Sequence, residues 1–135
     1  MNHWLLKSDP DTYSFDDLER DRRTVWDGVR NNQALIYLRQ MKRGDTAFIY
    51  HSGGDRAIIG SAAIVGGAYP DPKLDDEKLV VVDVAAGKRL PNPVTLSQIK
   101  RDPIFKDFLL VRNSRLSVMP VPSDLWTRLE SMGGL

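Results

Sequence analysis

Residues 46–65 read TAFIYHSGGDRAIIGSAAIV, and this stretch decides the fold class. Two apolar, β-branched and aromatic runs, residues 46–52 and 57–65, flank the tetrapeptide Gly53-Gly54-Asp55-Arg56. Glycines between two such runs are typical of a hairpin loop, and strands joined by a hairpin lie antiparallel. The stretch therefore predicts an antiparallel pair of strands in the middle of the chain.

Weaker patterns on either side predict the remaining elements. Strands are predicted at residues 3–7, 79–84 and 116–121, and a surface loop with two prolines at residues 68–73. Helices are predicted at residues 15–20 after an N-cap at Ser14, at 31–42 ending at Gly44, from an N-cap at Thr95, at 104–109, and at 123–132 as a capped helix ending at Gly133. The order lacks the repeated strand–helix–strand spacing of a doubly wound parallel sheet. It predicts an α+β fold with a small mixed barrel and peripheral helices.

Composition narrows the class of protein. The chain has 135 residues and 19 Lys and Arg against 18 Asp and Glu, a net charge of +1. Domains usually hold about 100 to 200 residues, so we expect a single domain over residues 1–135. With so little net charge, contact with nucleic acid must come from a local patch. There is no cysteine, and the apolar run at residues 4–6 is too short for a signal peptide. We expect a soluble, cytoplasmic protein with no membrane partner.

Few residue patterns favour catalysis. Gly60-Ser61-Ala62 lacks the second glycine of a nucleophile elbow, and no phosphate-binding loop or set of metal ligands is present. His51 is the best candidate for a general base, with Asp9 or Asp27 as its partner, because histidine titrates near neutral pH. No second catalytic group accompanies it. An enzyme acting on a nucleic-acid or small-molecule substrate is therefore the alternative hypothesis, and no cofactor is expected.

Polar and aromatic residues cluster where predicted strands end or loops begin. The clusters are Lys7-Ser8-Asp9-Pro10, Trp26-Asp27-Gly28-Val29-Arg30-Asn31, Tyr50-His51-Ser52 and Arg115-Leu116-Ser117. Strand-end loops carry many binding sites. An aromatic face with nearby hydroxyl and amide groups can hold a flat base, since stacking supplies affinity and hydrogen bonds to the base edge supply discrimination.

The three tryptophans have different expected roles. Trp4 lies in an apolar strand and Trp126 in the last helix, so both are expected in the core. Trp26 precedes Asp27-Gly28 in a predicted loop, where a core role and a ligand-binding role are equally reasonable.

The same residues resemble the EVE domain family. The opening His3-Trp4-Leu5-Leu6-Lys7-Ser8-Asp9-Pro10, the pairs Tyr13-Ser14 and Asp17-Leu18, and the block at residues 26–31 match the start of that family in order. Later blocks also match: Met41-Lys42, Gly44-Asp45, Tyr50-His51-Ser52, Ala68-Tyr69-Pro70-Asp71-Pro72, Pro93-Val94-Thr95-Leu96, Ile99-Lys100 and Arg115-Leu116-Ser117-Val118. Together they cover nearly the whole chain.

This resemblance implies a PUA-like fold, a small, mostly antiparallel β-barrel with peripheral short helices, related to the YTH domains that hold a methylated adenine. It implies non-catalytic binding of a modified base in DNA or RNA, single-stranded or flipped out, by a monomer. The implied ligand-binding residues are Lys7, Ser8, Asp9, Trp26, Gly28, Val29, Asn31, Tyr50, His51, Ser52, Arg115, Leu116 and Ser117. The chain departs from the family at Asn32, Leu35 and Ile36 and is shortened between Pro72 and Val80, where the pocket rim can differ.

Specific roles follow from these residue types. Trp26 is expected to stack on the base, Ser8, Asn31 and Ser52 to contact its edge, and Arg115 to attract phosphate. If the fold brings the two ends of the chain together, Ser8 and Arg115 line one pocket, and Arg115 faces the loop of Asp9. A structural clamp is the other possible role of Arg115. A protein-interaction module is a third hypothesis for the whole domain.

Overall fold

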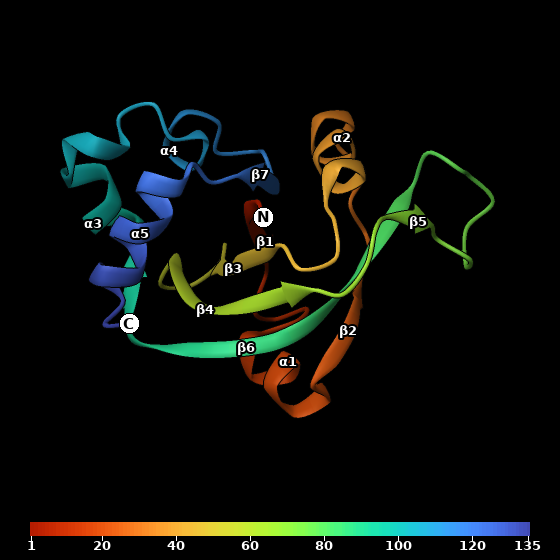
Figure 1. Cartoon of the computed structure of the whole chain (residues 1–135), viewed down its shortest axis with the longest axis horizontal. Helices are drawn as coiled ribbons and strands as arrows, with labels where there is room; N and C mark the ends of the chain where they lie inside the picture. The colour runs from red at the N-terminus through yellow and green to blue at the C-terminus, as the bar shows by residue number, and fades with distance from the viewer.

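The computed structural model describes residues 1–135 as one curled sheet with short helices around it (Figure 1). The strands are β1 (His3–Ser8), β2 (Arg23–Trp26), β3 (Thr46–His51), β4 (Ala57–Ile64), β5 (Tyr69–Pro70), β6 (Val80–Thr95) and β7 (Val118–Pro120). The helices are α1 (Phe15–Asp21), α2 (Asn32–Gln40), α3 (Leu96–Arg101), α4 (Leu109–Arg112) and α5 (Ser123–Met132), with a 3₁₀ turn η1 (Pro103–Phe105). None of these helices has the length and apolar character that a membrane crossing requires.

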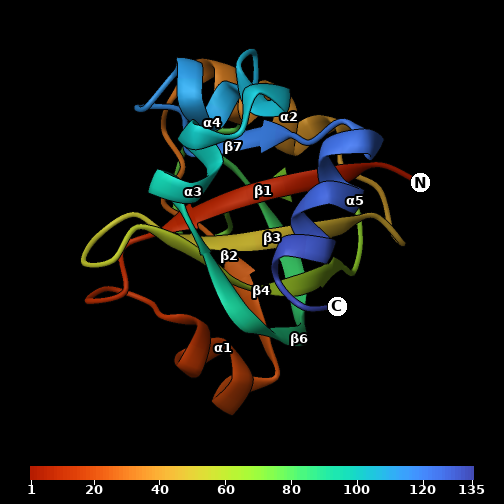
Figure 2. The same cartoon turned by 90° about the vertical axis from the view of Figure 1, so that its left-hand side faces the viewer.

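The sheet has the strand order β2-β6-β4-β3-β1-β7, and β5 pairs with the start of β6. β1 runs parallel to β3, whereas the other neighbouring strands are antiparallel. β2 and β7 stand at the two ends of this order, so the curled sheet is a half-barrel (Figures 1 and 2). The predicted α+β class and the predicted antiparallel pair, formed by β3 and β4, are confirmed.

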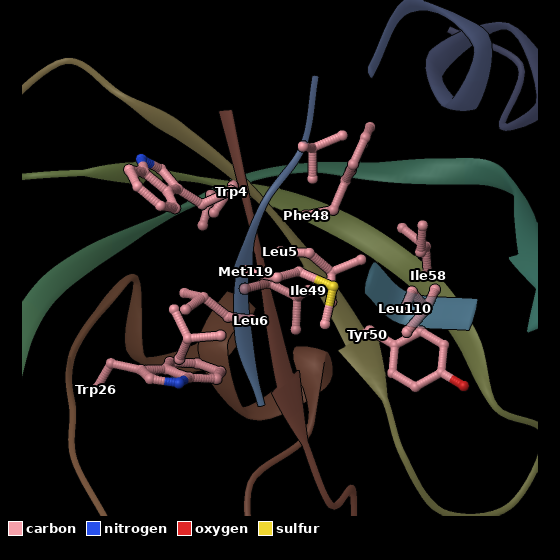
Figure 3. Close-up of a cluster of buried hydrophobic side chains, with 14 of the residues drawn as sticks. Trp4, Leu5, Leu6, Trp26, Phe48, Ile49, Tyr50, Ile58, Leu110 and Met119 are labelled. Atoms are coloured by element: carbon pink, nitrogen blue, oxygen red, sulfur yellow. The ribbon is translucent and has the colours of Figure 1, made fainter. Parts of the chain in front are cut away.

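The core contains 34 buried apolar residues. β1 contributes Trp4, Leu5 and Leu6, each at most 2% exposed, because both faces of this inner strand are covered. Figure 3 shows Leu5 beside residues of neighbouring strands, among them Ile49 and Met119. Trp4 and Trp126 belong to the core, as predicted.

The predicted N-caps at Ser14 and Thr95 are confirmed. Ser14 Oγ accepts a hydrogen bond from the N–H of Asp17 (3.1 Å), and the Asp17 carboxylate accepts one from the N–H of Ser14 (2.9 Å). This reciprocal pair satisfies two N–H groups that lack partners at a helix start. Thr95 and Gln98 form the same arrangement at α3.

The predicted helix at residues 31–42 is shorter in the structure. Asn31 caps α2 by accepting a hydrogen bond from the N–H of Ala34 (3.0 Å). The helix ends at Gln40 and not at the predicted Lys42, because the N–H of Lys42 bonds to the Asp45 carboxylate (3.0 Å) in the turn that leads to β3.

Strands β2, β5 and β6 differ from the prediction, and β5 lies inside the predicted surface loop at residues 68–73 because it pairs with Val80 and Val81. β2 is absent from the predicted elements, because its only apolar residues are Val25 and Trp26 and it is a strand only through pairing with β6. β6 continues to Thr95, past the predicted end at Val84, although it contains Pro91 and Pro93. Since β2 pairs only with residues 82–85 of β6, the later part of β6 has a free edge. There the missing N–H of proline costs no ladder bond.

The C-terminal third follows the prediction with smaller changes. Residues 104–109 divide between η1 and the start of α4, and the predicted strand at 116–121 is shorter, as β7. Helix α5 has the predicted bounds, but Pro122 occupies its N-cap position and no side chain caps it.

Candidate functional site

A pocket of about 490 Å³ lies between the end of β1 and strand β2. Ten residues from these strands and their adjoining loops line this first pocket: Lys7, Ser8, Asp9, Thr12, Tyr13, Thr24, Val25, Trp26, Asp27 and Gly28. Five of them, namely Lys7, Ser8, Asp9, Trp26 and Gly28, are among the predicted binding residues. The fold therefore joins the first two predicted clusters, which are separated in sequence by residues 11–25.

Local hydrogen bonds shape the loop that follows β1. The carbonyl of Asp9 accepts hydrogen bonds from the N–H groups of Thr12 (3.0 Å) and Tyr13 (2.9 Å), and its side chain accepts one from Asp11 N–H (2.9 Å). Ser8 Oγ donates to the carbonyl of Tyr13 at 2.5 Å. These bonds turn the chain back so that Tyr13 faces the end of β1. The Ser8 hydroxyl proton is used in this bond, so Ser8 Oγ is left as an acceptor toward the pocket.

Two aromatic rings form a corner of the first pocket. Tyr13 and Trp26 meet edge to face, with centroids 6.3 Å apart and an interplanar angle of 89°. Trp26 is only 7% exposed, and its ring lies beside Leu6 in Figure 3. Trp26 thus belongs to the core and also lines the first pocket.

The phenol of Tyr13 is held from outside the pocket. Its hydroxyl donates a hydrogen bond to Asp21 Oδ2 (2.9 Å). Burial raises the pKa of Tyr13, and the bond to Asp21 raises it further, against an opposing hydrogen bond with Thr24. The ring stays neutral near physiological pH and its position is fixed.

The polar lining of the first pocket favours a neutral or donor-rich ligand. Asp9 and Asp27 bring two carboxylates, which accept hydrogen bonds when ionised. Ser8 Oγ is a further acceptor, and Thr24 contributes a hydroxyl. A flat ring with amino or N–H groups on its edge matches this lining, whereas an anion in the same place would meet two like charges.

Two other predicted residues, Tyr50 and Ser52, line a second hollow together with Lys7. This second hollow, of about 300 Å³, is lined by Lys7, Tyr50, Ser52, Arg56, Leu96, Leu110 and Ser114. Lys7 and Tyr50 are directly paired in the parallel β1–β3 ladder, so their side chains share one face. Ser8 is the next residue on β1 and faces the other way. The two cavities thus divide the predicted residues, since Ser8 lines the first pocket and Tyr50 and Ser52 line the second hollow.

His51 and Asn31 form internal contacts and line neither cavity. His51 Nε2 accepts a hydrogen bond from the N–H of Phe15 (3.0 Å), and no hydrogen bond joins His51 to Asp9 or Asp27. The side-chain oxygen of Asn31 caps α2. These contacts fix the start of one helix each. The Asn31 side-chain oxygen is thus used within the chain, and the predicted pairing of His51 with Asp9 or Asp27 is not formed.

Val29 and the predicted C-terminal residues also stand outside the first pocket. Val29 and Leu116 are buried in the core, at 8% and 2% exposure. The carbonyl of Ser117 accepts a hydrogen bond from the N–H of Lys7 (2.9 Å), and β1 pairs with β7, so the two ends of the chain meet as predicted. Arg115 is exposed, lines neither cavity and forms no ion pair with Asp9. The backbone brings the two ends of the chain together, but Arg115 lines neither cavity.

Sequence reasoning missed Tyr13 and Thr24 as pocket residues. Thr24 and Trp26 are two positions apart on β2 and so lie on one face. Predicting β2 would have revealed Thr24. Tyr13 follows the turn at Asp9-Pro10, and only the backbone bonds of that turn bring it to the pocket.

The curled half-barrel with short peripheral helices is an α+β fold of the PUA-like kind, and an aromatic and polar pocket lies at its strand ends. The family model described as EVE domain matches residues 2–132, and the chain belongs to that family. The resemblance found in the sequence is thereby confirmed.

Relatives of known name or structure agree with this assignment. Thymocyte nuclear protein 1 from human is 32% identical over 158 residues, covering 91% of this chain and 70% of that protein. The chicken protein is 32% identical over 156 residues, and the match spans 90% of this chain and 64% of that protein.

Solved structures match more completely. A Rhodopseudomonas palustris protein has a TM-score of 0.94 and 42% identity over 99% of this chain and 94% of its own. Human THYN1 protein, solved in complex with DNA that contains 5-methylcytosine, has a TM-score of 0.91 and 31% identity over 100% of this chain and 99% of its own.

Proposed function

We propose that this EVE domain binds a modified base of a nucleic-acid strand in the first pocket and does not catalyse a reaction on it. The observation that carries the proposal is the corner of Tyr13 and Trp26 beside the acceptor groups of Ser8, Asp9 and Asp27. The human relative bound to 5-methylcytosine DNA makes that base the first candidate.

The energetics favour a base that is already unpaired or only weakly paired. Stacking on an aromatic ring contributes about 1 to 3 kcal/mol per base. Extruding a base from a duplex costs a few kcal/mol, so stacking must be combined with edge contacts. A pocket near 500 Å³ is within the usual range of about 300 to 1,000 Å³ for small-ligand sites. We therefore expect tighter binding to a single strand than to a matched duplex.

The non-catalytic interpretation is supported by the contacts of His51. A general base needs a free lone pair and a positioned partner. The Nε2 lone pair of His51 accepts the Phe15 N–H, and neither Asp9 nor Asp27 contacts the ring. No other observation favours the enzyme hypothesis. A monomeric state and a cytoplasmic location stay predictions, and light scattering on the purified chain tests the first.

The experiment is a fluorescence-anisotropy titration with labelled single-stranded DNA of one sequence, carrying one 5-methylcytosine or one cytosine. The wild-type domain is expected to prefer the methylated strand. Ser8→Ala removes a hydrogen-bond acceptor from the first pocket. Trp26→Phe keeps an aromatic residue in the core but reduces the ring area available for stacking. Each is expected to weaken methylated-strand binding about five- to tenfold.

Ser97→Ala is the matched control, because Ser97 is exposed on α3 and lines neither cavity. Equal wild-type affinity for the two strands rules out recognition of this modification. Ser8→Ala and Trp26→Phe that both bind like Ser97→Ala rule out the pocket. Turnover of the oligonucleotide that is lost in His51→Ala would instead establish the enzyme hypothesis.

A further inference from the structure

The second hollow differs from the first pocket in the charges of the side chains that line it. Its lining contains two charged residues, Lys7 and Arg56, and both are cations. Neither belongs to an ion pair, because the ion pairs of the chain are formed by Arg20, Arg89, Arg112 and Arg128. The hollow therefore has two basic side chains without an acidic neighbour in its lining. The first pocket, by contrast, has two carboxylates, Asp9 and Asp27, beside the shared Lys7.

Tyr50 gives this hollow a hydroxyl that lacks an internal partner. The residue as a whole is 3% exposed, and its hydroxyl forms no hydrogen bond within the chain. Figure 3 shows the ring beside Leu110 with the hydroxyl directed away from the core side chains. Burial raises the pKa of Tyr50, and the positive charge of Arg56 opposes that rise, so Arg56 lies near the phenol. The phenol thus keeps its proton and offers it as a donor into the hollow.

Lys7 is held over the same ring. Its Nζ lies 5.7 Å from the Tyr50 ring centroid and donates one hydrogen bond to the carbonyl of Ser114 (3.0 Å). An ammonium group has three protons, so two remain for another acceptor. Burial lowers the pKa of Lys7, and a bound anion would reverse that effect.

The backbone of Arg56 is also fixed. Its carbonyl accepts the first N–H of α3, from Leu96 (2.9 Å), and its N–H donates to Gly53 in the β3–β4 hairpin. Arg56 thus enters the hollow from a defined position, while its side chain remains exposed and unpaired. Lys7, Tyr50 and Arg56 together offer ammonium, phenol and guanidinium donors, which is the donor set that binds a phosphate oxygen.

We propose that the second hollow binds a backbone phosphate of the same nucleic-acid strand whose modified base enters the first pocket. The inference rests on the proposed function, because it is the base that brings the strand to this edge of the sheet. Lys7 lines both cavities and thus joins them. The carboxylates of the first pocket repel phosphate, and the hollow without carboxylates attracts it, so base and phosphate are assigned to opposite sides of β1.

The test uses the wild-type domain, Arg56→Gln and Tyr50→Phe with the single-stranded DNA described above, at several salt concentrations. Loss of one phosphate contact on single-stranded DNA lowers the slope of log K against log salt by about 0.7. Arg56→Gln is expected to show that change and a several-fold loss of affinity, with an unchanged ratio between methylated and unmethylated strands. Arg43→Gln is the matched control, because Arg43 is an exposed arginine at the opposite end of β3 and lines neither cavity.

A second arm identifies the phosphate. Neutral methylphosphonate linkages are placed one at a time on either side of the modified base. One position is expected to weaken wild-type binding and to have little further effect on Arg56→Gln, since the two changes remove the same contact. Arg56 is exposed, so the variant is expected to keep the wild-type melting temperature.

Each outcome has one meaning. An Arg56→Gln slope equal to that of Arg43→Gln, or independent effects of the linkage and the variant, overturns the proposal. Inorganic phosphate that raises the melting temperature of the wild type, without any slope change in Arg56→Gln, assigns the hollow to a free anion and also overturns it. A reduced slope together with equal binding of both strands supports the phosphate site and refutes the modified-base proposal.

Discussion

The backbone N–H of Phe15 donates a hydrogen bond to His51 Nε2 at 3.0 Å, across 36 positions of sequence. Phe15 is the first residue of α1, where N–H groups have no partner within the helix. The imidazole supplies that partner, so the ring is neutral with its proton on Nδ1. Arg89 holds the same helix from β6 through ion pairs with Asp16 and Glu19. Helix α1 is thus fastened to the sheet by a titratable group.

The first prediction concerns the stability of the domain between pH 5 and 7.5. Burial lowers the pKa of His51 below its usual 6.5, with Asp16 opposing and Arg89 reinforcing the effect. Its contribution is complete above the unfolded-state pKa and is lost as the pH falls through the folded-state pKa. Urea unfolding is expected to give lower stability at pH 5 than at pH 7.5. His51→Gln should reduce the difference in unfolding free energy between the two pH values, whereas His3→Gln should leave it unchanged. A His51→Gln variant with the same difference as the wild type would contradict the prediction.

A second prediction concerns Asp45, which is 3% exposed. Its carboxylate accepts hydrogen bonds from Trp4 Nε1, Asn2 N–H and Lys42 N–H, each at 3.0 Å. Asp45→Asn turns an amide donor toward at least one of these donors, which is expected to cost about 2 to 3 kcal/mol in the free energy of unfolding. Asp55→Asn in the exposed hairpin loop is the control. Equal urea midpoints for the two variants would disprove the role of Asp45.

The same carboxylate predicts sensitivity to acid. Burial acts to raise the pKa of Asp45, but the hydrogen bonds from Trp4, Asn2 and Lys42 outweigh it and the net shift is downward. A lowered pKa gives stability that is present above the unfolded-state value, near 3.8, and is lost as the pH falls through the folded-state value. We expect a loss of stability below about pH 4 that is smaller in Asp45→Asn. Parallel acid-unfolding curves would refute this.

The fourth prediction tests the contact between Gly60 and Phe15. A Cβ at Gly60 would lie 2.3 Å from Cζ of Phe15, whose ring is fully buried. Gly60→Ala is therefore expected to cost about 1 to 3 kcal/mol in unfolding free energy. Phe15→Leu removes the atoms that clash, so it should cost less in the Gly60→Ala background than in the wild type. Strictly additive effects in denaturant would show that the two residues do not compete for space.

The fifth prediction concerns Gly28 at the rim of the first pocket. Its φ of +77° is rare for L-residues, although a methyl group added at its Cα would have no other atom within 4 Å. Gly28→Ala is expected to cost about 1 to 2 kcal/mol through backbone strain alone, and Gly28→Asn less. Gly66→Ala is the control, because Gly66 also has open space but no positive φ. Thermal unfolding ranks the three variants, and an equal cost for Gly28→Ala and Gly66→Ala would contradict the strain.

Much of the fold could be predicted because the signals are local. The hairpin of residues 46–65, the caps at Ser14 and Thr95 and the bounds of α5 depend on neighbouring residues and on hydrophobic periodicity. β2 could not be predicted, because Arg23 and Thr24 have no strand signal and are ordered by pairing with Ala85 and Val84. Pairing between strands that are about sixty residues apart in sequence produces no pattern in the residues next to either strand.

The candidate site was predictable only as a set of residue types. The sequence by itself determined which strand ends carry aromatic and polar side chains, since these depend on composition and on where each apolar run stops. Only the tertiary structure decided how they are grouped. Ser8 lines the first pocket whereas Tyr50 lines the second hollow, and long-range packing uses His51 to hold Phe15. Periodicity is a property of one segment, whereas a cavity is formed by several segments whose pairing and orientation depend on the whole buried core.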